Sequence, residues 1–238
     1  MKLDFTRLLP GRSKLRQQVS IKLGMTNNQE LRKAISCITN QYGCLSEKER
    51  LSKVHLQIPA IEGLRRKYQH SISLIRQVVP DDVATWKYCC YEYAFNLIDP
   101  HRPDIRRDWV GRLISVDSGF AGYLAKTHLR KQDHPRSGCI VIYYSGAGKV
   151  EHAGKVVEED FVESKWGWLG HLWKHRIYEL PESYGSGVGF FSSISAEESG
   201  RAFETYVRLR QERSSDLLAQ TKRSSSSVQS RNLSNTCL

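Results

Sequence analysis

The sequence predicts an α+β fold, because helical patterns fill its first half and strand patterns dominate its second half. Apolar residues recur at helical spacing as far as Leu129, whereas runs of apolar and aromatic residues alternate with turn signals after Ser137-Gly138. Hydrophobic residues make up 39% of the 238 residues, which is enough for one sizeable domain. We therefore expect helices first and an antiparallel sheet after them.

Four segments are predicted along the chain. Residues 1–26 are basic and weakly patterned, which is typical of a flexible arm. Residues 27–79 are expected to form a helical N-terminal region with Lys and Arg on its outer face. Residues 80–213 hold the main domain, and residues 214–238 are serine-rich and poor in apolar residues, so we expect a disordered tail.

The N-terminal region contains three helical patterns. Asn27 is a candidate N-cap for the first helix. Ser46 and Glu49 form a capping-box pattern at the start of the second helix. A third helix is expected after Pro59, with one apolar stripe made by Ile61, Leu64, Tyr68, Ile72 and Ile75.

The main domain is expected to begin with helices and to continue as strands. TWKYCCYEYAFNLID, residues 85–99, is typical of a helix that ends at Asp99-Pro100, and residues 118–129 fit a second, short helix. A closing helix is predicted over residues 197–213. The predicted strands are residues 139–144, 151–159, 161–167, 175–180 and 188–194.

Charge and cysteine content limit the functional classes. The net charge of +11 favours anionic partners such as nucleic acid or anionic lipid, which the basic N-terminal region would contact. Six irregularly spaced cysteines do not form a disulfide scaffold, and adjacent cysteines have poor geometry for a shared metal, so we expect free thiols without metal or cofactor. No signal peptide and no apolar run near membrane-spanning length is visible, which predicts a cytoplasmic chain without a transmembrane segment.

Adjacent Cys89 and Cys90 raise the question of a catalytic thiol. A nucleophilic cysteine needs a stabilising site, commonly a helix N-terminus, together with a histidine and a group that orients the histidine. His152 heads a predicted strand after a glycine turn, and Glu163 occupies the corresponding part of the next strand, where a carboxylate–imidazole hydrogen bond would be in reach. Cys89 would turn about 100° away from Cys90 on a helix, so we expect it to pack. Packing is also the alternative for Cys90.

The segment CYEYA, residues 90–94, resembles the pattern around the nucleophile of papain-like cysteine hydrolases of the NlpC/P60 and CHAP type. That pattern is Cys, two variable residues, an aromatic residue and Ala. The stretch from Gly138 to Phe191 is similar to the strand–histidine–strand portion of poorly characterised bacterial and phage relatives, which carry an H-A-G-like strand, an S-K-x-G strand and a late Tyr-Gly. One departure is Gly138-Cys139, where these families often have Gly-Asp.

The resemblance implies a papain-like domain with its nucleophile helix packed on an antiparallel sheet. It implies a cysteine peptidase or amidase that acts on a peptide or amide substrate, with Cys90 as nucleophile, His152 as base and Glu163 as orienting group. Candidate substrate-binding residues are Tyr91, Ser164, Lys165 and Trp166, and His171 or His175 is the alternative third member. A deamidase or acyltransferase is a related alternative. The competing hypothesis is a non-enzymatic basic module that binds nucleic acid or a protein on an inactive papain-like fold.

Overall fold

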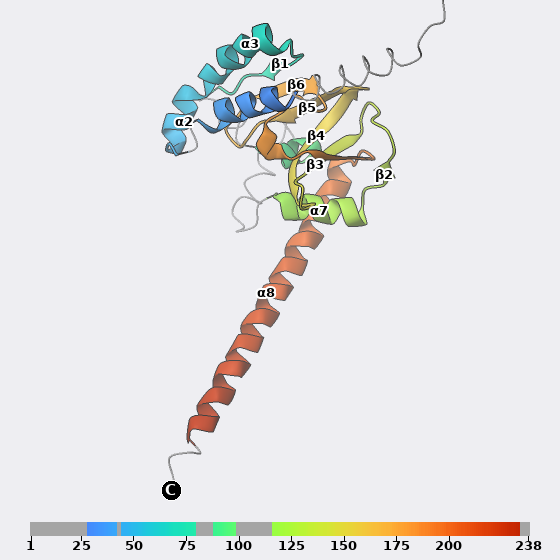
Figure 1. Cartoon of the computed structure of the whole chain (residues 1–238). Coiled ribbons are helices and arrows are strands. Elements are labelled where there is room, and N and C mark those ends of the chain that lie inside the picture. The colour runs from blue at the N-terminus through green and yellow to red at the C-terminus, as the bar shows by residue number, and fades with distance from the viewer. Residues whose placement is uncertain (1–27, 42–43, 80–87, 99–115, 234–238) are drawn as a thin grey trace, which may run out of the picture.

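The computed structural model describes residues 28–41, 44–79, 88–98 and 116–233, and residues 216–233 by their backbone alone. Within these residues, seven strands form one antiparallel sheet with helices on both faces (Figure 1). The predicted α+β class with an antiparallel sheet is therefore confirmed. The arm predicted for residues 1–26 lies outside the described residues.

The sheet has the strand order β1-β6-β5-β4-β3-β7-β2. β3 to β6 are neighbours in chain order because short turns connect them, and β7 returns to the free side of β3. The strands are β1 (Ser73–Arg76), β2 (Lys131–Gln132), β3 (Ile140–Tyr144), β4 (Val150–Glu158), β5 (Phe161–Lys165), β6 (Leu172–Arg176) and β7 (Gly187–Phe191).

Helices cover the two faces of this sheet in separate groups (Figure 1). The capping box predicted at Ser46 and Glu49 is confirmed, since Glu49 N–H donates to Ser46 Oγ at 3.4 Å and Ser46 N–H donates to Glu49 Oε2 at 3.0 Å. The helices are residues 28–40, α2 (Glu47–Lys53), η1 (Val54–Leu56), α3 (Gln57–Tyr68), α5 (Cys90–Ala94), α7 (Ser118–Thr127), η2 (Glu182–Tyr184) and α8 (Ala196–Leu233).

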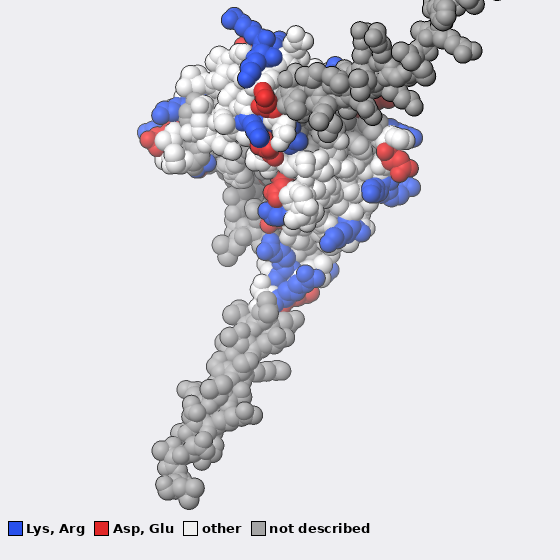
Figure 2. Space-filling view, viewed as in Figure 1, with Lys and Arg blue, Asp and Glu red and all other residues white. Residues whose placement is uncertain are grey.

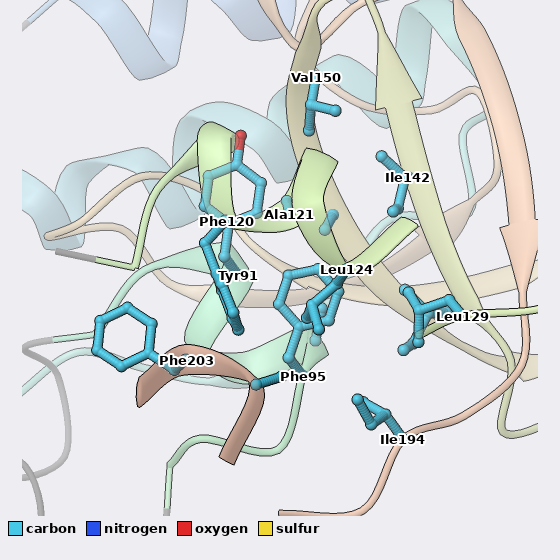
Figure 3. Packing of buried hydrophobic residues seen from close by; sticks show 14 of the residues in the cluster. Tyr91, Phe95, Phe120, Ala121, Leu124, Leu129, Ile142, Val150, Ile194 and Phe203 are labelled. Atoms are coloured by element: carbon cyan, nitrogen blue, oxygen red, sulfur yellow. The ribbon is translucent and has the colours of Figure 1, made fainter. Parts of the chain in front are cut away.

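Two hydrophobic cores lie on opposite faces of the sheet because side chains alternate along each strand. The first core joins α5, α7 and the start of α8 to Ile140, Ile142 and Ala153 of the sheet (Figure 3). The second core joins helix 28–40 and α3 to the other face. It contains Leu31, Ile35, Ile61, Ile72, Val141, Tyr143, Val156, Val162, Trp166 and Trp173.

The N-terminal region is part of this domain and does not form a separate helical unit. The third predicted helix ends at Tyr68, where Gln69 adopts a left-handed conformation with φ of 50°. Residues 73–76, which we expected to be helical, form β1 and pair with β6. The His70 ring stabilises this change of direction, because its Nε2 contacts the Ile61 carbonyl at 2.9 Å and its Nδ1 accepts from Ile72 N–H at 3.2 Å.

Two other boundaries differ from the sequence-based expectation. The strand predicted over residues 175–180 lies earlier, at β6, because Glu179 N–H donates to the Arg176 carbonyl and closes a turn there. The tail predicted to be disordered from Ser214 continues helix α8 to Leu233. The Ser214 and Ser215 hydroxyls donate to the carbonyls four residues earlier, at 2.9 and 3.0 Å, which is compatible with a helix. No described helix has an apolar stretch long enough to cross a bilayer.

Gly154 in β4 lies too close to β5 to carry a side chain. A Cβ atom there would lie 2.7 Å from Val162 Cγ1 and 2.8 Å from the Glu163 carbonyl oxygen. We expect Gly154→Ala to lower the free energy of unfolding by about 2 kcal/mol or more, measured by urea denaturation. Gly63→Ala is the matched control, because Gly63 is an exposed helical residue with open space around its Cα. It should raise stability by about 0.5–1 kcal/mol. Equal effects of the two substitutions would contradict the close approach of β4 and β5.

Candidate active site

Cys90 is the first residue of α5, and Cys89 is its N-cap. Cys89 is extended, with φ of −98° and ψ of 173°, and its N–H donates to Glu92 Oε2 at 2.6 Å. The Cys89 thiol donates to the Val116 carbonyl at 3.3 Å. Adjacent cysteines therefore have different surroundings: Cys89 caps the helix, and Cys90 turns toward β4.

The Cys90 thiol is buried between α5 and the sheet, with 8% of the residue exposed. The backbone N–H groups of Ala153, Tyr91 and Cys90 itself lie beside the sulfur, and the Lys165 ammonium is near. These groups lower the thiol pKa, but burial has the larger effect and raises the pKa of Cys90 to about 12. Cys90 is therefore a protonated thiol at neutral pH, held among donors that would stabilise a negative charge.

His152 is a buried imidazole with an unused nitrogen. It is 1% exposed, and its ring stacks on Tyr184 at 4.0 Å between centroids with 13° between the planes. Tyr143, its partner on β3, lies at a tilt 5.7 Å away. Among the residues that the structure describes, His152 Nε2 has no hydrogen-bond partner. Burial, with a smaller contribution from His175, holds the pKa of His152 well below its usual 6.5, so the ring is neutral.

Cys90 and His152 lie at neighbouring positions along β4 but toward opposite faces of the sheet, and no hydrogen bond joins them. Ala153 packs with Cys90 in the first core, and the preceding residue, His152, projects toward Tyr143 and the second core. The Cys90 sulfur lies beside the amide that joins residues 152 and 153. The Tyr184 ring stacks on His152, and burial, with a smaller contribution from Cys90, raises the pKa of its hydroxyl.

Glu163 is not placed to orient His152. It pairs with Lys155 on β4, three residues beyond His152, and so projects from the opposite face of the sheet. Its carboxylate accepts a hydrogen bond from the Tyr93 hydroxyl at 2.8 Å, which ties β5 to α5. The expected position was inferred from strand order alone, whereas the register decides the face on which a side chain lies.

Ser164, Trp166 and His175 form a hydrogen-bonded chain on the same face as His152. His175 Nδ1 contacts the Arg176 carbonyl at 2.7 Å, so Nδ1 carries the proton and Nε2 is the acceptor. Ser164 then donates to His175 Nε2 at 2.8 Å and accepts from Trp166 Nε1 at 3.1 Å. Burial lowers the pKa of His175 to about 4, which keeps this neutral tautomer. The chain contributes polar surroundings to His152, although neither Ser164 nor His175 bonds to it.

The other predicted substrate-binding residues are buried in the structure. Tyr91 packs in the first core, stacked on Phe95 at 6.4 Å between centroids (Figure 3). Lys165 is 1% exposed, donates to the carbonyls of Gly167 and Trp168 at 3.2 and 2.7 Å, and lies 4.6 Å from the centre of the Tyr88 ring. Lys165 thus contributes a buried positive charge near the start of α5.

His171, the other alternative third member, has a structural position. Its Nδ1 accepts from Val78 N–H at 3.0 Å and its Nε2 contacts the Val54 carbonyl at 3.0 Å. Burial lowers the pKa of His171 to about 4, which matches a neutral ring that bridges two backbone segments. In the part of the chain that the structure describes, His, Cys, Asp and Glu side chains form no group of three or more that could hold a metal ion.

Helix 28–40 holds Tyr184 in place, which the sequence analysis did not foresee. Ser36 Oγ accepts from Glu182 N–H at 2.7 Å and from Ser183 N–H at 3.4 Å. The Arg32 guanidinium donates to the Gly185 carbonyl. In the sequence, Tyr184 stood out only as part of the late Tyr-Gly pair, and nothing near Arg32 or Ser36 indicated a contact about 150 residues away.

Comparisons with protein-family models, curated proteins and solved structures find no match to this chain. The similarity to papain-like hydrolases therefore stays a prediction from the residues quoted above, and the described geometry is the ground on which a function is proposed.

We expect the folded chain to lose stability in acid, because its buried histidines are neutral and resist protonation. The pKa values of His171 and His175 are lowered to about 4 in the folded chain from 6.5, so the unfolded chain binds more protons between these values. Stability should be constant above pH 7 and should fall as pH drops from 6.5 to 4, by up to about 3 kcal/mol for each histidine. Urea midpoints across this range measure the change.

The variant His171→Gln isolates one of these contributions. Its unfolding free energy should be lower at pH 7 but should depend less steeply on pH, by up to about 1.4 kcal/mol per pH unit. His134→Ala is the control, since His134 is exposed. An unchanged pH dependence in His171→Gln would show that His171 is not neutral in the folded chain.

Proposed function

We propose that this chain is a cysteine hydrolase that cleaves an amide bond, with Cys90 as nucleophile and His152 as general base. One observation carries the proposal: a thiol surrounded by backbone N–H groups packs against Ala153 of β4, and the preceding residue is a buried imidazole whose Nε2 has no partner among the described residues. Buried polar atoms without partners are uncommon in folded proteins, so the unpaired nitrogen of an imidazole next in sequence to Ala153, which contacts the thiol, favours a chemical role.

The proposed chemistry follows from the neutral state of both groups. His152 removes the thiol proton as the Cys90 sulfur attacks the carbonyl carbon, and the backbone N–H groups around the sulfur are near the charge that develops. The carbon–nitrogen bond then breaks, and the imidazolium gives its proton to the leaving amine. Water, deprotonated by the same ring, attacks the thioester and releases the acid and the free thiol. Lys165 supports this sequence by lowering the pKa of Cys90.

Tyr184 takes the positioning role that the sequence analysis gave to Glu163. Its ring covers one side of the His152 imidazole, and η2 is itself held by helix 28–40. Cys90 and His152 are 8% and 1% exposed and face opposite sides of β4, so the proposed proton transfer requires a rearrangement that brings the ring to the sulfur. Substrate entry then requires a movement around Cys90 and His152.

The test is acylation by the activated ester p-nitrophenyl acetate. We expect an acetyl thioester on Cys90, found by peptide mass mapping, and no acetylation there in Cys90→Ala. His152→Ala should lower the acylation rate about 100-fold or more. Cys139→Ala is the matched control, because Cys139 is also 8% exposed but packs in the second core, and it should react like the wild type. Equal acetylation of Cys90 in the wild type and in His152→Ala would contradict the proposed pair.

The positioning role of Tyr184 gives a separate prediction. Tyr184→Leu removes the aromatic stack and should lower the rate of Cys90 acylation about tenfold or more, whereas Tyr184→Phe keeps the stack and should retain the rate. Glu163→Gln should change the rate little, because Glu163 lies on the opposite face of the sheet from His152. A large loss in Glu163→Gln with no effect of Tyr184→Leu would reverse the two assignments.

Binding of an anionic partner is the second expectation from the sequence. On the face shown in Figure 2, Lys and Arg side chains lie singly or in small groups with Asp and Glu between them. The last turn of α3 carries Arg65, Arg66 and Lys67 close together. This basic turn alone does not favour nucleic-acid binding over the proposed hydrolase.

A further inference from the structure

A large cavity adjoins the Tyr184 side of the candidate site. Its volume is about 990 Å³, and it lies between the start of helix 28–40, the turn between β3 and β4, and residues 182–186. Glu151, which precedes His152, and Gly185, which follows Tyr184, both line it. The cavity is therefore lined by the sequence neighbours of His152 and Tyr184.

Arg32 lines this cavity as a buried cation without a carboxylate partner. The residue is 9% exposed, and its guanidinium donates to the Gly185 carbonyl. Its Nε is buried and has no hydrogen-bond partner within the described ranges. Arg32 forms no ion pair with a carboxylate in the described part of the chain. Burial lowers the pKa of Arg32, and Glu182 offsets this only in part. Guanidinium groups with unused donors are well suited to carboxylates, which they bind through two parallel hydrogen bonds.

The N-terminal end of helix 28–40 adds a second positive electrostatic field, which favours a negative charge in the cavity. Asn28 and Gln29, its first residues, line the same cavity, one turn before Arg32. Backbone N–H groups in a first helical turn lack intrahelical acceptors, and the helix dipole is positive at this end. The side chains of Ser145, Ser183 and Ser186 also line the cavity and offer hydroxyl donors. These groups converge on a space large enough for several peptide atoms.

Acidic residues in the cavity limit which anion fits. Glu151 is paired with Lys149 at 3.4 Å, and Glu182 is exposed to solvent. Their charges disfavour a polyanion, and both carboxylates can accept hydrogen bonds from peptide N–H groups. One buried cation with acidic groups around it matches a ligand that carries a single carboxylate and several N–H donors.

We propose that this cavity binds a carboxylate of the substrate peptide, with Arg32 as the principal ligand. The assignment to a substrate rests on the proposed hydrolase function, because residues next to His152 and Tyr184 line the cavity. The carboxylate belongs either to the C-terminus of the peptide or to an acidic side chain, and both present the same group to Arg32.

Arg32 also has a structural contact, which the test must separate from ligand binding. Its bond to Gly185 helps to hold the segment that carries Tyr184. Ser36 provides the matched control, because it holds the same segment through Glu182 and Ser183 but is not among the residues that line the cavity. If Arg32 only held this segment, substitutions of Arg32 and Ser36 would have the same effect on peptide binding.

The experiment measures binding of three acetylated tripeptides by calorimetry, in the full chain with Cys90→Ala so that no turnover occurs. The peptides are trialanine with a free C-terminal carboxylate, trialanine amide, and Ala-Glu-Ala amide. We expect one or both carboxylate peptides to bind about tenfold more tightly than trialanine amide, with a preference that weakens as salt rises. The better carboxylate peptide identifies the source of the group.

Variants of Arg32 then test whether Arg32 causes the preference for carboxylate peptides over trialanine amide. Arg32→Gln should abolish it, Arg32→Lys should retain part of it, and Ser36→Ala should leave it unchanged. Equal binding of all three peptides by the unsubstituted site overturns the proposal, even if Arg32→Gln does not fold. An equal loss in Arg32→Gln and Ser36→Ala overturns it as well. Peptide binding is measured in Cys90→Ala, which lacks the nucleophile. The binding result therefore stands or falls separately from the p-nitrophenyl acetate test of the proposed function.

Discussion

Strand β4 is the element on which the rest of the structure depends, because its alternate residues face two different cores. Ala153 packs against α5, and His152 projects among the aromatic residues of the other face. Gly154 allows β5 to approach closely, and this approach fixes the register that places Glu163 opposite Lys155. The positions of Cys90, His152 and Glu163 relative to one another thus depend on a single strand and its register.

Burial determines the chemical state of the candidate site. In a low dielectric the charged forms of both groups are disfavoured, so the Cys90 pKa rises to about 12 and the pKa of His152 falls. A preformed thiolate–imidazolium pair is therefore not the resting state. The N–H groups beside Cys90 and the nearby Lys165 stabilise negative charge, so they would favour the charged state of the proposed reaction.

Helix 28–40 links the N-terminal region to this chemistry. Ser36 and Arg32 hold the segment that carries Tyr184, and the Tyr184 ring fixes one side of His152. The same helix contributes its first turn and Arg32 to the adjacent cavity. A region that the sequence indicated as a separate attachment therefore covers one face of the sheet and lines a proposed binding site.

The sequence by itself determined the local features. Its periodicity predicted the antiparallel strands after Ser137, and its capping pattern predicted the start of α2. The segment CYEYA made Cys90 a candidate, and a glycine turn before a predicted strand made His152 one. These features depend on neighbouring residues, so they can be read from a short window of the chain. The end of α3 and the continuation of α8 were missed because the same local patterns are compatible with more than one conformation.

Only the tertiary structure decided which side chains meet. Val150 pairs with Tyr144 and His152 pairs with Tyr143, so Glu151 is an extra residue in β4. An insertion of this kind changes the face on which every later side chain lies, and its position is set by pairing with β3. The register with β5 separates Glu163 from His152, and the fold brings Arg32 to Gly185 across most of the chain. These contacts join distant segments, and no local pattern encodes them.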